Sequence, residues 1–201
     1  AILDGLKGRK TIPLSEMCAA INPPRSEVAA KPDSLEVTFV DMSSVSNDGY
    51  IEQRQIRTIE EVRKGGYTYF AEGDVIVAKI TPCMENGKCA LANDLKNGIG
   101  FGSSEFHVFR TNSKASGAFL FYCLNRDGVR RAAEKVMTGS SGHKRVPIEF
   151  YENLPVPNIT LAEQKKIVDA IKVCESRIAV LKKQIADCRA KRISAVEKFL
   201  A

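Results

Sequence analysis

The chain has 201 residues, of which 44% are hydrophobic and 27% charged, and it carries a formal net charge of +6. These values are typical of a soluble globular protein with one domain, or with one domain and an appendage. No segment approaches the run of about 18 apolar residues that a membrane span needs, and residues 1–11 lack the apolar centre of a signal peptide. We therefore expect a cytoplasmic protein without a membrane partner.

The cysteines indicate free thiols rather than a disulfide framework or a metal site. They lie at positions 18, 83, 89, 123, 174 and 188, without a Cys-x-x-Cys pair, and the chain has only two histidines. This spacing does not suit zinc, and it is typical of a protein from a reducing compartment. We expect neither a metal nor a cofactor.

The first 157 residues alternate between short strands and short helices. Strands are expected where apolar and β-branched residues concentrate, over residues 11–18, 35–42, 75–80, 89–92 and 105–110. Two short helices are expected over residues 116–124 and 127–137. The glycines at 98, 100 and 102 indicate a hairpin or a bulged strand. The pattern predicts a mixed α+β domain over residues 1–157, ending in a stiff extended hinge at Leu154-Pro155-Val156-Pro157.

One long helix is predicted over residues 158–201, because neither glycine nor proline occurs after Asn158. Thr160 and Glu163 have the spacing of a capping box. Steps of four and three residues alternate between the apolar positions, which is the heptad repeat of a coiled coil. We call these positions the seam: Ile167, Ile171, Cys174, Ile178, Leu181, Ile185, Cys188, Ala195 and Phe199, with Arg192 interrupting them.

A helix of this length overshoots a domain built from the preceding residues. At about 1.5 Å per residue the heptad region is a rod of roughly 50 Å. We therefore expect the seam to pair with a second helix, from another copy of the chain or from another protein, in a dimer or a larger assembly. The alternative is an amphipathic helix that lies on its own domain.

The positive charge is concentrated in this helix. Residues 161–201 hold ten Lys and Arg against five Asp and Glu, whereas the remaining residues hold 20 against 19. A basic excess indicates an anionic partner, for which nucleic acid is the usual candidate. The alternative is that the charges only keep an exposed helix in solution.

Three motifs that suggest an enzyme each lack a required part. Asn22-Pro23-Pro24-Arg25 resembles the Asn-Pro-Pro-aromatic motif of amino-methyltransferases, but Arg25 replaces the aromatic residue that stacks on the flipped base. The glycines from Gly98 to Gly102 lack the following helix of a dinucleotide-binding fingerprint. Asp33 and the segment Asp94-Leu95-Lys96 are too loosely spaced for a nuclease site. We therefore expect a non-catalytic protein.

Two loops carry residues suited to nucleic acid. Lys79–Lys88 and Gly139–Arg145 both mix Gly, Ser, Thr, Asn, Lys and Arg. Backbone amides and hydroxyls of such loops bind phosphate, whereas Lys, Arg and Asn can also reach base edges. The alternative is that each is an ordinary solvated loop.

Four blocks of sequence, in this order, resemble the specificity subunits of type I restriction-modification systems. They are Gly73–Lys88, Gly100–Phe106, Thr138–Pro147, and Leu154–Pro157 followed by Glu163–Val168. The resemblance implies that residues 1–157 are one DNA target recognition domain and that residues 158–201 are a spacer helix. Complete subunits of this family have two such halves, whose long helices pair antiparallel, so this chain is a half-length subunit or a fragment.

The resemblance also implies the function and the partners. The chain would recognise a specific sequence of double-stranded DNA and so direct adenine methylation and restriction. The chemistry would belong to a modification subunit, which carries S-adenosylmethionine, and to a translocating restriction subunit. The alternatives are a self-contained nuclease or methyltransferase domain with a coiled-coil tail, and a coiled-coil adaptor without a DNA role.

Within this domain we expect DNA contacts from Lys79, Thr81, Asn86, Lys88, Ser103, Ser104, Ser140, Ser141, His143, Lys144 and Arg145. Lys88 and Lys144 are predicted to anchor phosphates. Asn86 and Arg145 can bind adenine and guanine, respectively, through two hydrogen bonds. The alternative for Arg145 is an ion pair with an acidic neighbour, such as Glu149, that only fixes the loop.

Overall fold

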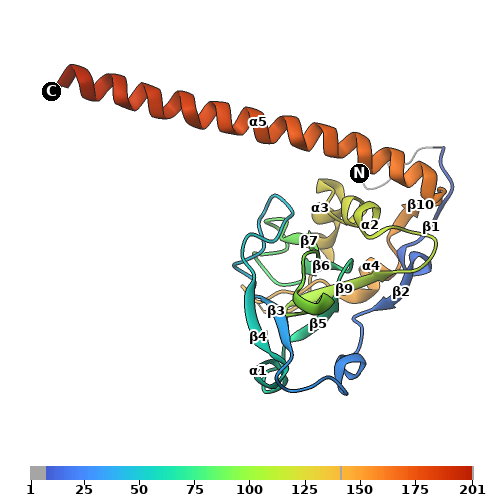
Figure 1. The fold of residues 1–201 in the computed structure, drawn as a ribbon. Coiled ribbons are helices and arrows are strands. Elements are labelled where there is room, and N and C mark those ends of the chain that lie inside the picture. The colour runs from blue at the N-terminus through green and yellow to red at the C-terminus, as the bar shows by residue number, and fades with distance from the viewer. Residues whose placement is uncertain (1–7, 141, 201) are drawn as a thin grey trace. The chain divides into compact units, whose positions relative to one another are not determined.

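Residues 8–140 and 142–200, which the computed structural model describes, belong to two units. The first, residues 1–161, contains the β-sheets and is called the sheet unit. The second, residues 162–201, is the helix unit and continues α5, which runs from Leu161 to Leu200 (Figure 1). Among the described residues, no helix combines the length and the apolar character needed to cross a bilayer.

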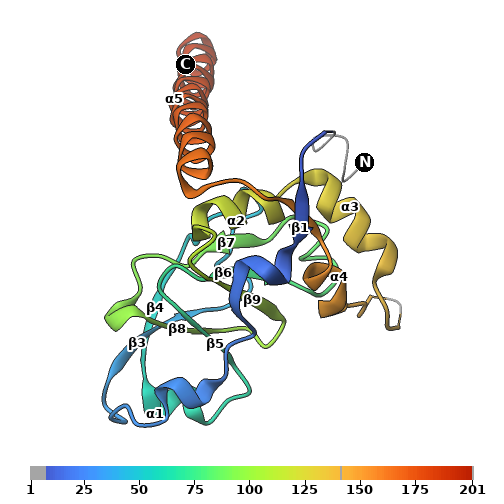
Figure 2. The same ribbon diagram turned by 90° about the vertical axis from the view of Figure 1, so that its right-hand side faces the viewer.

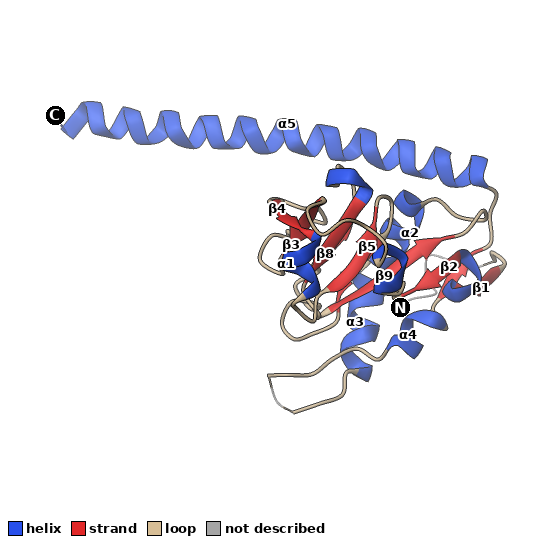
Figure 3. Cartoon of the chain, turned by 60° about the horizontal axis from the view of Figure 1, so that its bottom comes forward, coloured by secondary structure: helices blue, strands red, loops and turns tan. Residues whose placement is uncertain are grey.

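Short strands and helices alternate along the sheet unit. Its strands are β1 (Thr11–Pro13), β2 (Cys18–Ile21), β3 (Glu36–Val40), β4 (Gln55–Thr58), β5 (Thr68–Ala71), β6 (Val75–Ala78), β7 (Cys89–Leu91), β8 (Ile99–Gly102), β9 (Phe106–Thr111) and β10 (Pro155–Pro157). Its helices are α1 (Ile59–Arg63), α2 (Gly117–Leu124), α3 (Asp127–Val136) and α4 (Ile148–Glu152), with 3-10 helices η2 (Leu14–Met17), η3 (Arg25–Val28) and η4 (Lys96–Gly98). The predicted α+β fold with a long C-terminal helix is confirmed (Figure 3).

The strands form two four-stranded sheets and one two-stranded ribbon. One sheet has the order β2-β9-β6-β7 and is antiparallel throughout. The other has the order β4-β3-β8-β5, in which β3 and β8 are parallel. Helix α2 covers the first sheet, where it contacts β6, β7 and β9 (Figure 2).

The second sheet is buried on both faces. Phe39 and Phe101 pack with Ile59 of α1 on one face, whereas Val40 and Phe70 pack toward the first sheet on the other. Because side chains alternate between the faces of a strand, the glycines of β8 lie on the Phe70 side. A Cβ on Gly100 would overlap the Phe70 ring, which explains the glycine at this position. The hairpin or bulged strand predicted at the alternating glycines was wrong, because β8 pairs with β3 and β5 in continuous register.

The continuous strand predicted over residues 11–18 was wrong. The 3-10 helix η2, Leu14–Met17, separates β1 from β2. Leu14 and Met17 are three residues apart and both are buried, and a 3-10 turn places residues with this spacing on the same side. The apolar pair therefore reaches the core without a continuous strand.

The segment predicted as a hinge is extended, but it also has a partner. Pro155–Pro157 forms β10 and pairs antiparallel with β1, so that Ile12 lies opposite Val156. The amide of Leu14 donates to the carbonyl of Leu154 over 2.9 Å and continues the pairing.

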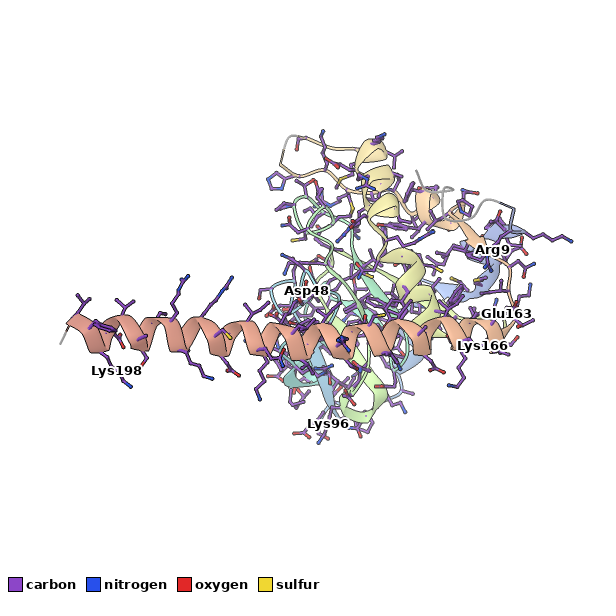
Figure 4. All side chains as sticks on the ribbon, turned by 90° about the horizontal axis from the view of Figure 1, so that it is seen from above. Arg9, Asp48, Lys96, Glu163, Lys166 and Lys198 are labelled. Carbon is purple, nitrogen blue, oxygen red and sulfur yellow. The ribbon has the colours of Figure 1, made fainter. Side chains whose placement is uncertain are left out.

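Helix α5 is exposed over most of its length. Every residue from Lys172 to Leu200 is exposed, including the large seam residues Ile178, Leu181 and Ile185. A shallow groove in the helix unit is lined by Leu181, Ile185 and Cys188 together with Arg192. Figure 4 shows polar side chains, such as those of Lys166 and Lys198, projecting from the two ends of the helix.

Candidate nucleic-acid interface

The two predicted loops are attached to the same sheet. The first loop, residues 79–88, connects β6 to β7, and the second loop, residues 138–145, follows α3. In the antiparallel pair of β6 and β9, Ala78 lies opposite Phe106. The start of the first loop therefore lies beside the segment that precedes β9, and the amide of Lys79 donates to the carbonyl of Glu105 over 2.9 Å.

Backbone pairing joins the second loop to the first. Arg145 forms β-bridges with both Thr138 and Ile80. The first of these closes the second loop on itself, and the other ties it to the first loop. The amide of Thr81 also donates to the carbonyl of Lys144 over 3.0 Å. Loops that are far apart in the sequence thus form one cluster.

Helix α3, to which the sequence analysis gave no role, is fixed against the first loop. Gly87 has a φ of +82°, and a Cβ at this position would overlap the guanidinium of Arg130. Arg130 is itself paired with Asp127 at the start of α3. Just beyond the other end of the helix, Met137 Sδ lies 3.9 Å from Thr81 Oγ1 of the first loop. The helix therefore contacts the first loop near both of its ends.

Arg145 forms an ion pair, but with Glu105 and not with Glu149. Its Nε and Nη2 donate to the two carboxylate oxygens of Glu105 over 2.9 Å and 2.7 Å, and Nη1 donates to the carbonyl of His143 over 3.1 Å. The hydrogen bonds from Arg145 lower the pKa of Glu105. Since a guanidinium has five N–H donors, two remain for a ligand. The sequence analysis did not identify Glu105 as the partner of Arg145, because Glu105 lies just before β9 and is 40 residues away in the sequence.

Five of the predicted residues have exposed side chains without a hydrogen-bond partner among the described residues: Asn86, Ser104, Ser140, His143 and Lys144. Lys79 is half-buried and also makes no side-chain hydrogen bond there. The hydroxyl of Ser103 instead accepts the amide of Glu105 over 3.2 Å. Ser141 lies outside the described residues.

Two predicted residues are engaged in holding the loops. The ammonium of Lys88 donates to the carbonyls of Met42 and Val45 over 2.9 Å and 2.6 Å. The hydroxyl of Thr81 donates to a carboxylate oxygen of Glu85 over 2.9 Å. A phosphate contact from Lys88 stays a prediction, and it would require the ammonium to leave two carbonyl oxygens.

A buried histidine supports the second loop. His107 Nε2 lies 2.9 Å from the carbonyl oxygen of Val146, so Nε2 carries the hydrogen. Burial lowers the pKa of His107. Its Nδ1 is buried without a hydrogen-bond partner among the described residues. The imidazole is therefore neutral, and it fixes the end of the loop through one hydrogen bond.

The methyltransferase-like motif has a structural role. The side-chain oxygen of Asn22 accepts the amide of Val108 over 2.9 Å. The guanidinium of Arg25 donates to the carbonyls of Val62 and Gly65 over 2.9 Å and 2.7 Å, at the end of α1. These contacts explain both polar residues of the motif without a substrate.

The residues of the nuclease-like pattern are paired separately. Asp33 binds Arg63, whereas Lys96 binds Glu36 over 3.0 Å. Within the part of the chain that the structure describes, no group of three or more His, Cys, Asp and Glu side chains is arranged to hold a metal ion. Burial raises the pKa of Cys18 to about 12 and that of Cys123 to about 11, so these thiols are not nucleophiles.

A cluster of loops joined by backbone pairing, with exposed Lys, Asn and Ser side chains, has the chemistry of a nucleic-acid-binding surface. The family comparison agrees with this chemistry. The chain belongs to the type I restriction modification DNA specificity domain family, whose family model matches residues 7–187. The family resemblance inferred from the four sequence blocks is therefore confirmed.

Two curated relatives are specificity subunits of type I restriction enzymes from Escherichia coli. The chain is 41% identical to the EcoEI subunit over 165 residues, which are 81% of this chain and 27% of that subunit. It is 42% identical to the EcoAI subunit over 153 residues, which are 75% of this chain and 25% of that subunit. The chain thus spans about a quarter of each curated relative.

Two solved structures share the fold. The HsdS subunit from Thermoanaerobacter tengcongensis matches with a TM-score of 0.69 and 24% identity, over 90% of this chain and 45% of that chain. A chain from a study of the complex assembly and conformational transition of the type I R-M system matches with a TM-score of 0.70 and 23% identity, over 90% of this chain and 46% of that chain. The chain spans less than half of either.

Proposed function

We propose that the sheet unit recognises a specific sequence of duplex DNA, as the targeting part of a type I restriction-modification complex. Family membership over residues 7–187 is the observation that carries this proposal. The loop cluster supports it, because it presents Asn86 and Lys144 from two loops that are joined by backbone hydrogen bonds. The phosphate contacts would set the position on the duplex, and the base contacts would select the sequence.

The chain acts in this proposal as a non-catalytic component. Its partners are a modification subunit, which supplies S-adenosylmethionine and methyl transfer to adenine, and a restriction subunit that translocates DNA. The relatives that carry the name of specificity subunit support this assignment. Because these partners act on duplex DNA inside the cell, the proposal places the complex in the cytoplasm.

Helix α5 serves in this proposal as a spacer. Its exposed seam pairs with a second copy of the helix, or with the helix of a second half. Two rigidly paired helices hold two recognition units at a fixed separation, so they fix the distance between two half-sites on the DNA. The exposed large apolar residues of α5 support the pairing, because they would otherwise remain in water.

Mapping the methylated adenines in the source genome tests the targeting role. In cells that lack the gene encoding this chain, one defined sequence motif should lose its methylation while every other motif keeps it. Restoring the gene should restore that motif alone. A methylation pattern that does not depend on the gene would contradict the proposal.

Binding measurements with the purified chain separate DNA recognition from an adaptor role. The logarithm of the binding constant for duplex DNA should fall linearly with the logarithm of the salt concentration, with a slope of about −0.9 for each phosphate contact. A duplex that contains the methylated motif should bind more tightly than a scrambled duplex of equal length. An adaptor would bind neither.

A further inference from the structure

Most of the described cations of the sheet unit are engaged within the fold, either by an ion pair or by a side-chain hydrogen bond. Arg110 pairs with Asp74 and Glu27, and Arg145 pairs with Glu105. Pairing of this kind removes a cation from use by a phosphate, because the existing partner must first be given up. Among the described residues of the sheet unit, the cations that form neither an ion pair nor a side-chain hydrogen bond are Arg9, Lys10, Lys31, Lys79, Arg131, Lys135 and Lys144.

These free cations are unevenly distributed. Lys79 and Lys144 lie in the loop cluster, and Arg131 and Lys135 lie on α3. The helix leads directly into the second loop (Figure 3), and its Arg130 lies against Gly87 of the first loop. More than half of these free cations are therefore carried by α3 and the loops that it contacts.

The two cations of α3 share one face of the helix. Arg131 and Lys135 are four residues apart, so they are neighbours on the helix surface, and both are exposed. Their separation along the axis is about 6 Å. DNA carries one charge per roughly 3.4 Å of axis on each strand, so two successive cations on α3 can follow one strand.

We propose that the exposed face of α3 contacts the phosphate backbone of duplex DNA through Arg131 and Lys135, beside the loop cluster. The inference rests on the proposed DNA recognition and adds a second contact zone to it. These residues carry no base specificity in this role. They anchor the duplex, so that Asn86 and the second loop can meet the base edges.

The same face contains an internal control of opposite sign. Glu134 is exposed and lies beside Lys135, three residues from Arg131. If a phosphate strand passes over this face, Glu134 repels it, and its removal strengthens binding. If no DNA passes there, removing Glu134 has no effect.

Fluorescence anisotropy with the full chain and a mixed-sequence duplex tests the proposal over a range of salt concentrations. Arg131→Gln and Lys135→Gln should each reduce the salt slope by about one unit, and the double variant by about two. Glu134→Gln should tighten binding at low salt. Circular dichroism checks that each exposed substitution leaves the fold intact.

Lys31→Gln is the matched control. Lys31 is exposed and free, and its carbonyl is held by Arg63 of α1. Helices α1 and α3 lie at different ends of the sheet unit (Figures 1 and 2). The control should keep the wild-type slope although it removes the same charge. Variants of α3 that behave like Lys31→Gln would overturn this inference alone, whereas a wild-type chain that binds no duplex would overturn the proposed function.

Discussion

At the scale of single residues, Arg145 combines two roles that the sequence analysis treated as alternatives. These roles are an ion pair with an acidic neighbour and a contact with a DNA base. Glu105 holds the guanidinium through two hydrogen bonds, and two donors remain. An arginine held in this way is pre-oriented, so less side-chain entropy is lost when it binds a base. The ion pair and a role in base reading are therefore compatible.

This geometry predicts that Glu105→Ala and Arg145→Ala relax the same position of the methylated motif. Loss of one bidentate base contact should reduce discrimination by roughly 1–3 kcal/mol. Methylation mapping of complexes that carry each variant measures this directly. Lys144→Ala is the comparison, because loss of a phosphate anchor should weaken binding to all sequences alike. An unchanged motif in Arg145→Ala, with only reduced protein stability, would mean that the pair is structural.

His107 predicts a pH dependence of stability. Burial lowers the pKa of His107 below its ordinary value of 6.5 in the folded state, so the unfolded chain binds a proton more readily. The contribution of neutral His107 to the free energy of unfolding is therefore fully present above pH 6.5. It is lost as the pH falls below that value. Urea unfolding at pH 7.5 and pH 5.5 should show a lower midpoint at pH 5.5.

His107→Gln provides the control for this pH effect, because it removes the titrating group. Over the same interval its unfolding midpoint should change less than that of the wild type. The pKa values of Asp41 and Glu105 are lowered by hydrogen bonds, so these carboxylates titrate below the interval. An equal change in both proteins would show that another group is responsible.

The residue types of the loop cluster could be predicted from the sequence, but their partners could not. Asn86 and Lys144 are exposed as expected, because the polar residues of a loop between buried apolar strands remain in contact with water. The sequence pattern could not show that Lys88 differs from these residues. Its ammonium is held by the carbonyls of Met42 and Val45, which are distant in sequence. Glu105 was missed for the same reason.

At the scale of elements, the strongest local patterns were the most predictable. The apolar run Val75–Ala78 forms the buried strand β6, and the two short helices α2 and α3 lie within the residues predicted for them. Strand β4 was missed because its residues Gln55–Thr58 are largely exposed at a sheet edge, so they lack an apolar signal. Its place depends on pairing with β3, which no local pattern encodes.

Helix α5 carries the prediction of self-association. Ile178 and Leu181 lie on the seam and are about half exposed, at 50% and 47%. In a coiled coil these side chains would be buried, so replacing both with Asp should weaken the dimer by roughly a hundredfold or more. Sedimentation equilibrium at micromolar concentration measures this change. A wild-type chain that remains monomeric at high concentration would contradict self-association.

Val180→Asp and Val173→Asp are the matched controls for the seam. Both valines are on the same helix and are exposed, at 57% and 70%, but neither occupies a seam position. These changes introduce the same charge at the same helix with little effect on pairing. Equal weakening by seam and control variants would show that charge, rather than the seam, governs association.

At the scale of the whole molecule, the proposed role is recognition, and the chemistry is expected from the partner subunits. Purified chain given S-adenosylmethionine, magnesium and duplex DNA should neither methylate nor cut. The same preparation combined with the modification subunit should methylate, which shows that the chain is active as a component. Turnover by the chain alone that is lost on mutating one of its carboxylates would contradict this expectation.

The ribbon of β1 and β10 determines how the domain is connected to what surrounds it. Because Thr11 lies opposite Pro157, the polypeptide enters and leaves the sheets at one shared point. The residues between the two strands therefore begin and end side by side. This segment can be replaced by another that begins and ends with the same pair of strands, without displacing the chain on either side. In the proposed role, recombination at two short sites would then give a new target preference, whereas the segments on either side keep their geometry.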